Sequence, residues 1–303
     1  TKTIITKNAT SFRGIFIFTK IKIAFSIFTR MQKPTLYKIY ASALFVTLAL
    51  LLFYLFLNHH YDGSIWQSMQ QSKSAITGEY CELDQSKHFF RQTMNTYSNL
   101  GYFFLGCIVV LVSFYDRKAP VSIEKNRLQQ FPLLSFFFGC CLMYLCFGSS
   151  FFHASLTWIG QRADMNGTYS ICITLTGISY YRLLIKENPS QRYKRIFVCV
   201  LFCIVLLFIQ LHLLISSLFL LPFLILLIIT GTVINYLRNK NNFNIQLAIL
   251  SLLLMIAAAV LRSVDVQKVA CDPTSLYQGH SLWHFFTGMS AFLLYWFYRS
   301  EKV

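Results

Sequence analysis

Charged residues are scarce in this sequence, and acidic residues are the scarcest. Only 13% of the 303 residues are charged, with 11 Asp and Glu against 27 Lys and Arg. Hydrophobic residues make up 55% of the chain, and its mean hydropathy is +0.53. Soluble globular domains carry about 25% charged residues. The composition therefore excludes that class and indicates a protein embedded in a membrane.

Two further patterns are missing from the apolar runs. The runs are continuously apolar rather than short and alternating, which excludes a transmembrane β-barrel. The chain also shows no internal repeat and no pair of broken apolar segments, which argues against a transporter. What remains is a single bundle of transmembrane helices.

Eight apolar runs approach the ~20 residues that a helix needs to cross the hydrocarbon core. One stretch, 196–237, is too long for a single crossing and is split near 212–217. The predicted spans are 40–58, 95–115, 131–152, 164–185, the two halves of 196–237, 245–261 and 280–298. We therefore predict an all-α, polytopic transmembrane helical bundle.

The net charge of +16 invites the hypothesis of a nucleic-acid partner, because phosphate binding uses a basic surplus. The Lys and Arg residues instead lie in short segments between the apolar runs, where they orient a membrane protein. Their distribution excludes nucleic acid and predicts that both termini are cytoplasmic. A bacterial inner membrane and an ER or Golgi membrane fit this topology equally well.

The N-terminal segment 1–39 is basic and precedes the first predicted span. Within it, residues 1–30 have the composition of an interfacial amphipathic helix. They also fit an over-extended start or a targeting segment, and we expect them to lie outside the fold.

Histidines gather at the predicted outer face. His153 ends the third span, while His280 and His284 open the eighth. His280 and His284 are four residues apart, so they project from one face of a helix, a spacing that suits two ligands of one zinc ion. Three protein ligands and one open position are typical of catalytic zinc. The alternative is that these are interfacial histidines.

Two polar residues accompany these histidines. Asp164 lies eleven residues after His153 and could take a proton from a zinc-activated water and return it to a leaving group. The alternative for Asp164 is a helix N-cap, since the fourth span is predicted to start there. Ser149 precedes His153 by four and shares its helix face, but such serines commonly bond their own backbone.

Three blocks of the sequence resemble the alkaline ceramidases. They are "GSSFFHASLTWIGQRAD" with its Ser149, His153 and Asp164, "HSLWHFFTG" with its two histidines, and "EYCELD" followed by "MNTYSN". The resemblance implies a seven-helix core over 79–298, with 40–58 as an additional helix. It also implies His153, His280 and His284 as zinc ligands, with Ser149 and Asp164 as catalytic partners in hydrolysis of the amide bond of ceramide.

The resemblance further implies a calcium site in the acidic segment. Glu79, Glu82 and Asp84 offer the oxygen ligands that calcium prefers. Gln92 stands where the family has a Glu, so one negative charge is lost there. The alternative for these residues is a set of ordinary solvated acids in a loop.

Seven of the nine cysteines fall within predicted spans, where cysteine behaves as a small hydrophobe. Cys81 and Cys271 fall in outer loops instead, beside the predicted site. An oxidising outer compartment would allow them to form a disulfide. Two free thiols, or Cys81 as a metal ligand, are the alternatives.

Together, these features predict a zinc-dependent intramembrane amidohydrolase that acts on ceramide or a similar lipid amide. The superfamily to which the alkaline ceramidases belong also includes adiponectin-receptor-like proteins and lipid-remodelling hydrolases of GPI anchors. A receptor or scaffold with a structural zinc is therefore an alternative, with Asp164 or Cys271 as the fourth ligand that closes the site. A lipid-remodelling esterase is the other alternative.

Overall fold

The computed structural model describes residues 33–119, 125–185 and 189–302. The chain divides into two compact units, 1–41 and 42–303. The described part of the first unit, 33–41, forms the first turns of one helix, and the predicted segment 1–30 lies outside the described residues. All further description concerns the second unit.

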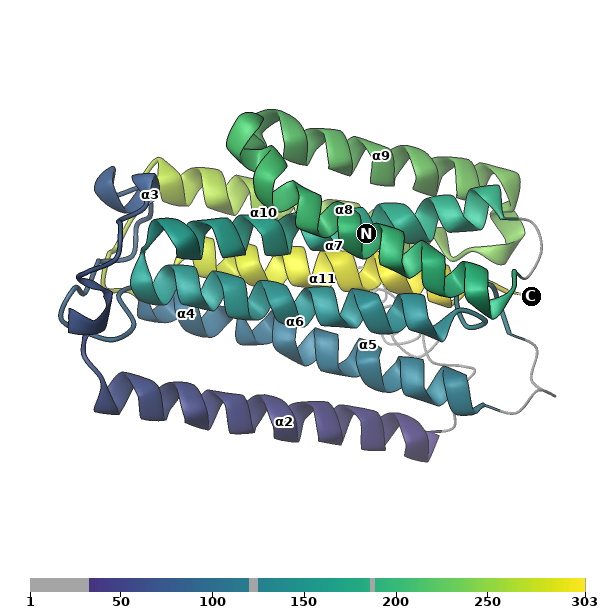
Figure 1. The fold of residues 1–303 in the computed structure, drawn as a ribbon, viewed down its shortest axis with the longest axis horizontal. Coiled ribbons are helices and arrows are strands. Elements are labelled where there is room, and N and C mark those ends of the chain that lie inside the picture. Colours follow the sequence, from purple (N-terminus) through teal and green to yellow (C-terminus); the bar gives the residue numbers. More distant parts are fainter. Residues whose placement is uncertain (1–32, 120–124, 186–188, 303) are drawn as a thin grey trace, which may run out of the picture. The chain divides into compact units, whose positions relative to one another are not determined.

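The described residues are mostly helical and contain no β-strand, which confirms the predicted all-α class (Figure 1). Short helices lie in two of the connections: η1 (Gly63–Trp66) and α3 (Lys73–Ile76) lie between the first two long helical segments, and η2 (Lys240–Asn242) lies between α9 and α10. The long helices follow the predicted spans, and the long apolar stretch breaks where predicted. In chain order, the remaining helices are α2 (Lys33–His60), α4 (Thr93–Ser98), α5 (Leu100–Lys118), α6 (Pro132–Ser155), α7 (Trp158–Leu184), α8 (Gln191–Leu214), α9 (Ser217–Arg238), α10 (Ile245–Val266) and α11 (Gly279–Arg299).

The start of α7 differs from the prediction. The helix begins at Trp158, six residues before the predicted start at Asp164, because Thr157 caps it. The Thr157 hydroxyl accepts a hydrogen bond from the Gly160 backbone N–H at 3.2 Å. Asp164 therefore lies within the helix, and the N-cap interpretation of Asp164 is wrong.

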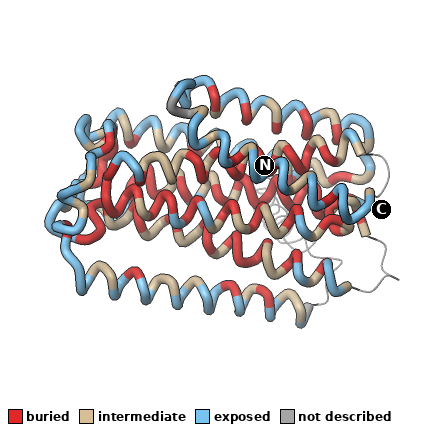
Figure 2. Tube along the Cα trace, in the orientation of Figure 1, coloured by how far each residue is buried: buried red, intermediate tan, exposed pale blue. Residues whose placement is uncertain are grey.

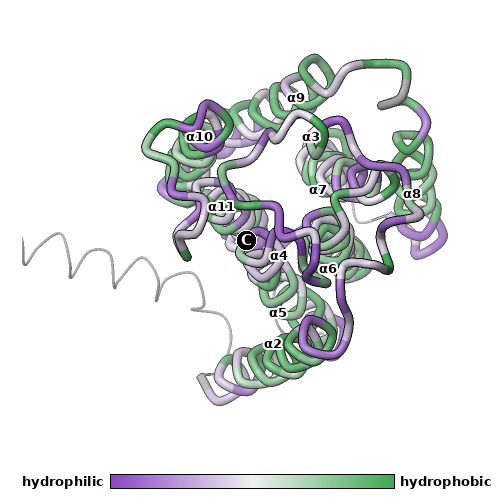
Figure 3. The backbone as a smooth tube through the Cα atoms, turned by 90° about the vertical axis from the view of Figure 1, so that its left-hand side faces the viewer, coloured by the Kyte–Doolittle hydropathy of each residue, from purple (hydrophilic) through white to green (hydrophobic). Residues whose placement is uncertain are grey.

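Inner and outer helices differ in burial. Buried positions concentrate on α5, α6, α7 and α11 (red in Figure 2), while α8, α9 and α10 lie around them and expose large apolar side chains. Figure 3, which looks along the helices from the end that carries α3 and α4, shows these outer helices as largely hydrophobic. Such outward apolar faces are what lipid requires of a spanning helix.

Six of the described helical segments are long and apolar enough to cross a membrane, with α4 and α5 counted together. The long helices α7 and α11, of 27 and 21 residues, are not among them. Both contain polar residues of the predicted site, and the helices around them cover these residues. The chain is thus an integral membrane protein, and its predicted site residues lie on inner helices.

Glycines let α6 and α7 approach closely. A Cβ atom at Gly148 would lie 2.7 Å from the Ala163 carbonyl oxygen, and one at Gly167 would lie 2.8 Å from the Leu145 Cα. Small residues at a helix–helix contact are a common means of tight packing in membranes. This contact fixes where α7 places its polar residues relative to α6.

The end of the bundle away from the histidines is rich in basic residues and ion pairs. Arg299 binds Asp116 at 2.6 Å, and each side chain is only 3% exposed. Arg182 pairs with Glu301 at the same end. The helix ends and connections there also hold Arg117, Lys118, Lys125, Arg127, Arg192, Arg195, Arg238 and Lys240.

Candidate active site

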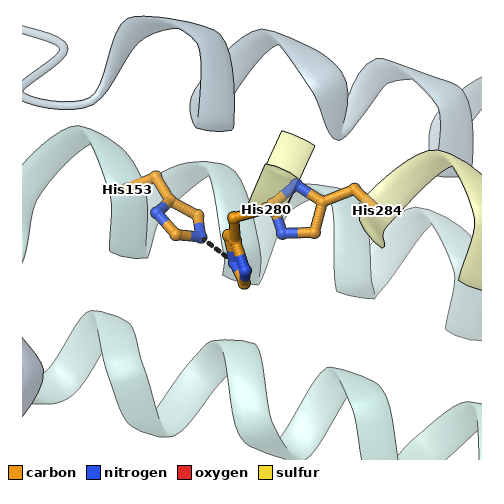
Figure 4. A group of neighbouring side chains, drawn as sticks. All are labelled: His153, His280 and His284. Carbon is orange, nitrogen blue, oxygen red and sulfur yellow. Dashed lines mark hydrogen bonds between the residues drawn. The ribbon is translucent and has the colours of Figure 1, made fainter. Parts of the chain in front are cut away.

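Three histidines meet at one end of the bundle. His153 lies near the end of α6, and His280 and His284 lie in the first two turns of α11 (Figure 4). Their ligand atoms all lie within 4.8 Å of one another, and His153 Nε2 is 3.2 Å from His280 Nε2. All three side chains are buried. Among the described residues, this is where three metal-ligating side chains converge.

Two of the imidazoles are held through their Nδ1 atoms. Gln92 Oε1 lies 2.7 Å from His153 Nδ1, and Ser98 Oγ lies 2.7 Å from His284 Nδ1. Because Gln92 Oε1 can only accept, His153 carries its proton on Nδ1 and has a lone pair on Nε2. Such partners on the outer nitrogen are typical of histidines that bind metal.

The donor set fits zinc. Three imidazoles in a buried pocket, with the outer nitrogens of two of them bonded to the protein, match the ligands of a catalytic zinc site. His280 Nδ1 is buried and has no hydrogen-bond partner among the described residues. A cation shared by the imidazoles would bind His280 through Nε2, the atom that lies 3.2 Å from His153 Nε2.

Ser149 and Asp164 lie beside the histidines. Ser149 is fully buried, and its hydroxyl is 3.5 Å from His284 Nε2. It also forms a hydrogen bond with the Asp164 carboxyl group. The structure thus brings all five predicted residues together: Ser149, His153, Asp164, His280 and His284.

Gly148 controls the distance between Ser149 and Asp164. A Cβ at Gly148 would lie 2.7 Å from the Ala163 carbonyl oxygen and 3.2 Å from the Asp164 nitrogen, so α7 would have to shift. The catalytic role that the sequence predicts for Ser149 and Asp164 implies that Gly148→Ala lowers the rate of amide hydrolysis about a hundredfold, since small displacements of catalytic groups have effects of that size. Initial rates measured on a lipid amide would check this.

Gly101→Ala is the matched control, because the nearest atom to its Cβ is Phe285 Cδ2 at 4.0 Å. Its activity should stay close to that of the wild type. Equal losses in the two variants would show that the Gly148 contact does not position α7.

A disulfide joins Cys81 to Cys271, the first of the alternatives expected for this pair. It connects the loop before α4 to the segment between α10 and α11. Asp265, near the end of α10, reinforces this junction: its carboxylate accepts hydrogen bonds from the His280 backbone N–H at 3.0 Å and from the Cys81 N–H at 3.2 Å. The loop, α10 and the start of α11 are thereby tied together beside His280.

We predict that the double variant Cys81→Ser, Cys271→Ser melts at a lower temperature. The disulfide closes a long stretch of chain, and removing such a link costs about 2–4 kcal/mol. Thermal unfolding in detergent measures the change, with Cys199→Ser, an exposed free cysteine on α8, as the control. Thiol labelling of the denatured wild type should detect seven cysteines, and two more after reduction. Nine reactive thiols without reductant would contradict the disulfide.

The residues that were expected to bind calcium form hydrogen bonds or ion pairs with other groups of the protein. Asp84 pairs with Arg91, and Glu79 Oε1 lies 3.1 Å from Arg262. Glu82 accepts from the backbone N–H groups of Met94 at 2.6 Å and Asn95 at 2.8 Å. Burial raises the pKa of the Glu82 carboxyl to about 7, while those two donors act in the opposite direction. Gln92, the fourth candidate, faces His153.

Sequence reasoning missed four neighbours of the histidines. Gln92 was expected at calcium rather than at His153, and Ser98 and Asp265 were not singled out. Tyr80, whose ring centroid is 4.3 Å from that of His280 and 5.2 Å from that of His153, was also missed. Ser98 belongs to the block "MNTYSN" that carries the resemblance, which was an available signal. Nothing in the sequence near Asp265 indicates its contacts.

An apolar cavity of about 310 Å³ lies among the helices, and its wall includes Trp283, the chain neighbour of His284. It is lined mostly by α7, α9, α10 and α11, and Tyr102, Trp283 and Thr287 belong to its wall. The Tyr102 ring also lies 6.0 Å from the His284 ring, centroid to centroid. The cavity is therefore close to His284, and its apolar walls suit hydrocarbon chains.

A family model for Ceramidase matches residues 70–301 of the chain. The chain belongs to the Ceramidase family. The Ceramidase match contains all five residues of the site and both disulfide cysteines, and it begins after α2. A search of curated proteins finds no match. Membership of the Ceramidase family implies a hydrolase that acts on amides.

Proposed function

We propose that the chain is a zinc-dependent intramembrane amidohydrolase. Its reaction would convert ceramide, or a similar lipid amide, to a sphingoid base and a fatty acid. The observation that carries the proposal is the meeting of three buried histidines with Ser149 and Asp164 beside an apolar cavity. Family membership supports hydrolysis of an amide, and the cavity supports a lipid substrate.

His153, His280 and His284 would hold the zinc ion. When bound, zinc supplies a Lewis acid that polarises a carbonyl and makes water a nucleophile at neutral pH. Gln92 and Ser98 keep His153 and His284 oriented for this role through their Nδ1 atoms. Burial of the site excludes bulk water, so charges that develop there interact strongly.

Asp164 would move the proton during hydrolysis. Its carboxylate accepts a proton from the attacking water as a bond forms between the water oxygen and the amide carbon. The carbon–nitrogen bond then breaks, and Asp164 returns the proton to the departing amine. The products are a fatty acid and a sphingoid base. Ser149 can donate a hydrogen bond to the oxyanion that forms at the carbonyl oxygen.

The substrate would bind from the membrane. Its amide would lie at the histidines, while a hydrocarbon chain would extend past Tyr102 and Trp283 into the cavity between α7, α9, α10 and α11. The basic end of the bundle would face the cytoplasm, in keeping with the positive-inside rule. The site would then face the opposite side of the membrane, where a disulfide is stable.

The proposal does not extend to calcium, because the candidate ligands have other partners. The alternative of a structural zinc site in a receptor or scaffold needs a fourth protein ligand. Cys271 cannot serve as that ligand while it is bonded to Cys81. Asp164 remains, and its substitution separates the two hypotheses.

Mass spectrometry of reaction products tests the proposed function. Purified protein would be incubated with defined ceramides, matched lipid esters and acylated glycerolipids, each with and without a zinc chelator. We expect a sphingoid base and a fatty acid from ceramide, with activity lost on chelation and restored by zinc. Cleavage of esters alone would favour a lipid-remodelling esterase. If zinc-loaded protein cleaved none of these lipids, the proposed enzymatic function would be wrong.

A further inference from the structure

The acidic residues in the loop before α4 are paired with other groups of the protein. The Arg91 guanidinium donates to both carboxylate oxygens of Asp84, with Nε 2.8 Å from Oδ1. The Arg262 guanidinium lies 3.1 Å from Glu79 and its carbon lies 5.8 Å from the centroid of the Trp283 ring, next to His284 in sequence. Each of these carboxylates thus faces a positive charge from the chain itself.

Glu82 and Gln92 do not complete a calcium site either. Both oxygens of Glu82 accept from the first backbone N–H groups of α4, where a helix terminus favours a negative charge. Gln92 carries no charge and directs its side-chain oxygen at His153 Nδ1. Calcium affinity depends on the number of charged oxygen ligands that converge. In this loop the three carboxylates are directed to three different partners.

The same loop is fastened to the end of α6. The backbone N–H of Arg91 donates to the Ala154 carbonyl at 3.1 Å, and that of Gln92 donates to the His153 carbonyl at 3.0 Å. Arg91 Nη1 also donates to the Ser155 carbonyl at 3.2 Å. Arg91 therefore links Asp84 to α6, and Gln92 is the next residue along the chain. The Gln92 side chain is placed by a network of protein contacts.

We propose that this loop positions His153 without calcium: Arg91 and Arg262 take the place of the cation, and Gln92 is the residue that positions the imidazole. The proposal rests on the proposed role of His153 as a zinc ligand. An acceptor at Nδ1 keeps the proton there and leaves the Nε2 lone pair for metal. Loss of such a partner typically weakens metal binding about 10- to 100-fold.

The first experiment adds calcium to the full-length protein in detergent, after calcium has been removed. We expect neither the melting temperature nor the zinc affinity to change more than with magnesium, the matched control. A saturable rise of the melting temperature with calcium alone, abolished in Asp84→Asn, would overturn the proposal.

The second experiment compares Gln92→Met with Gln92→Glu. Methionine has a similar length and provides no good acceptor, so the zinc affinity measured by chelator competition should fall about 10- to 100-fold. Glutamate keeps an oxygen acceptor at His153 and should retain the wild-type affinity or exceed it. The melting temperature of the zinc-free protein monitors the fold separately from zinc binding.

Gln161→Met is the matched control, since Gln161 lies at the same end of the bundle and bonds Ser74 at 3.1 Å. Its zinc affinity should not change. Unchanged affinity in Gln92→Met, or an equal loss in Gln92→Glu, would overturn the role of Gln92. Failure of the wild type to bind zinc would instead reject the proposed function, so the two failures are distinguishable.

Discussion

Replacing His284 with alanine should abolish zinc binding and amide hydrolysis together. His284 lies where α5, α6 and α11 meet: its ring contacts those of His153 and His280, and its Nε2 is 3.5 Å from Ser149 Oγ. Removal of this imidazole leaves two ligands, too few to retain a catalytic zinc. We expect zinc content near zero and hydrolysis at the uncatalysed background, measured by metal analysis and by mass spectrometry of the products.

His88→Ala is the matched control for this prediction, because His88 is an exposed histidine in the loop at the same end of the bundle. That variant should keep both zinc and activity. Zinc retained in His284→Ala would remove His284 from the metal site. Zinc lost with full turnover would show that hydrolysis does not need the metal, and the proposed mechanism would be wrong.

The fold was largely predictable from the sequence because long apolar runs determine where membrane helices form. The break between α8 and α9 lies where predicted, near 212–217. The start of α7 was placed six residues too late because Trp158 to Ala163 is only moderately apolar. The signal there was local: Thr157 accepts from the Gly160 N–H and starts the helix.

The five candidate residues that the structure brings together could be named from the sequence, since helix spacing relates His280 to His284 and relates Ser149 to His153. Which neighbours would orient them was not predictable. Gln92 meets His153 and Ser98 meets His284 across 61 and 186 positions of sequence. Those contacts depend on how the loop before α4 folds back on α6 and how α11 packs against α4. No periodicity or residue spacing in a single sequence encodes either of these two packing arrangements.

The calcium expectation shows the same limit in a different way. The family resemblance implied a shared cation for these acidic residues, but the direction of each side chain depends on partners elsewhere in the sequence. Arg262, on α10, lies 183 positions from Glu79. Asp265, three residues later, bonds the backbone of Cys81 and of His280. The end of α10 thus organises both the acidic loop and the first turn of α11.

Replacing Asp164 with asparagine should keep zinc and remove most of the turnover. Asparagine has nearly the shape of aspartate, so it preserves the contact with Ser149 and the packing of α7 on Gly148. It cannot accept and return a proton as a carboxylate does, and loss of general acid–base catalysis typically costs about 10²–10⁴ in rate. We expect kcat to fall by that amount with a smaller change in KM, measured from initial rates.

Asp62→Asn, at an exposed aspartate before η1, is the control and should change neither quantity. Turnover close to that of the wild type in Asp164→Asn would reject the proton-transfer role. Loss of zinc in Asp164→Asn would have a different meaning, since it would make Asp164 a fourth protein ligand. A zinc site with four protein ligands has no open position for water, so that outcome would favour the structural-zinc hypothesis over hydrolysis.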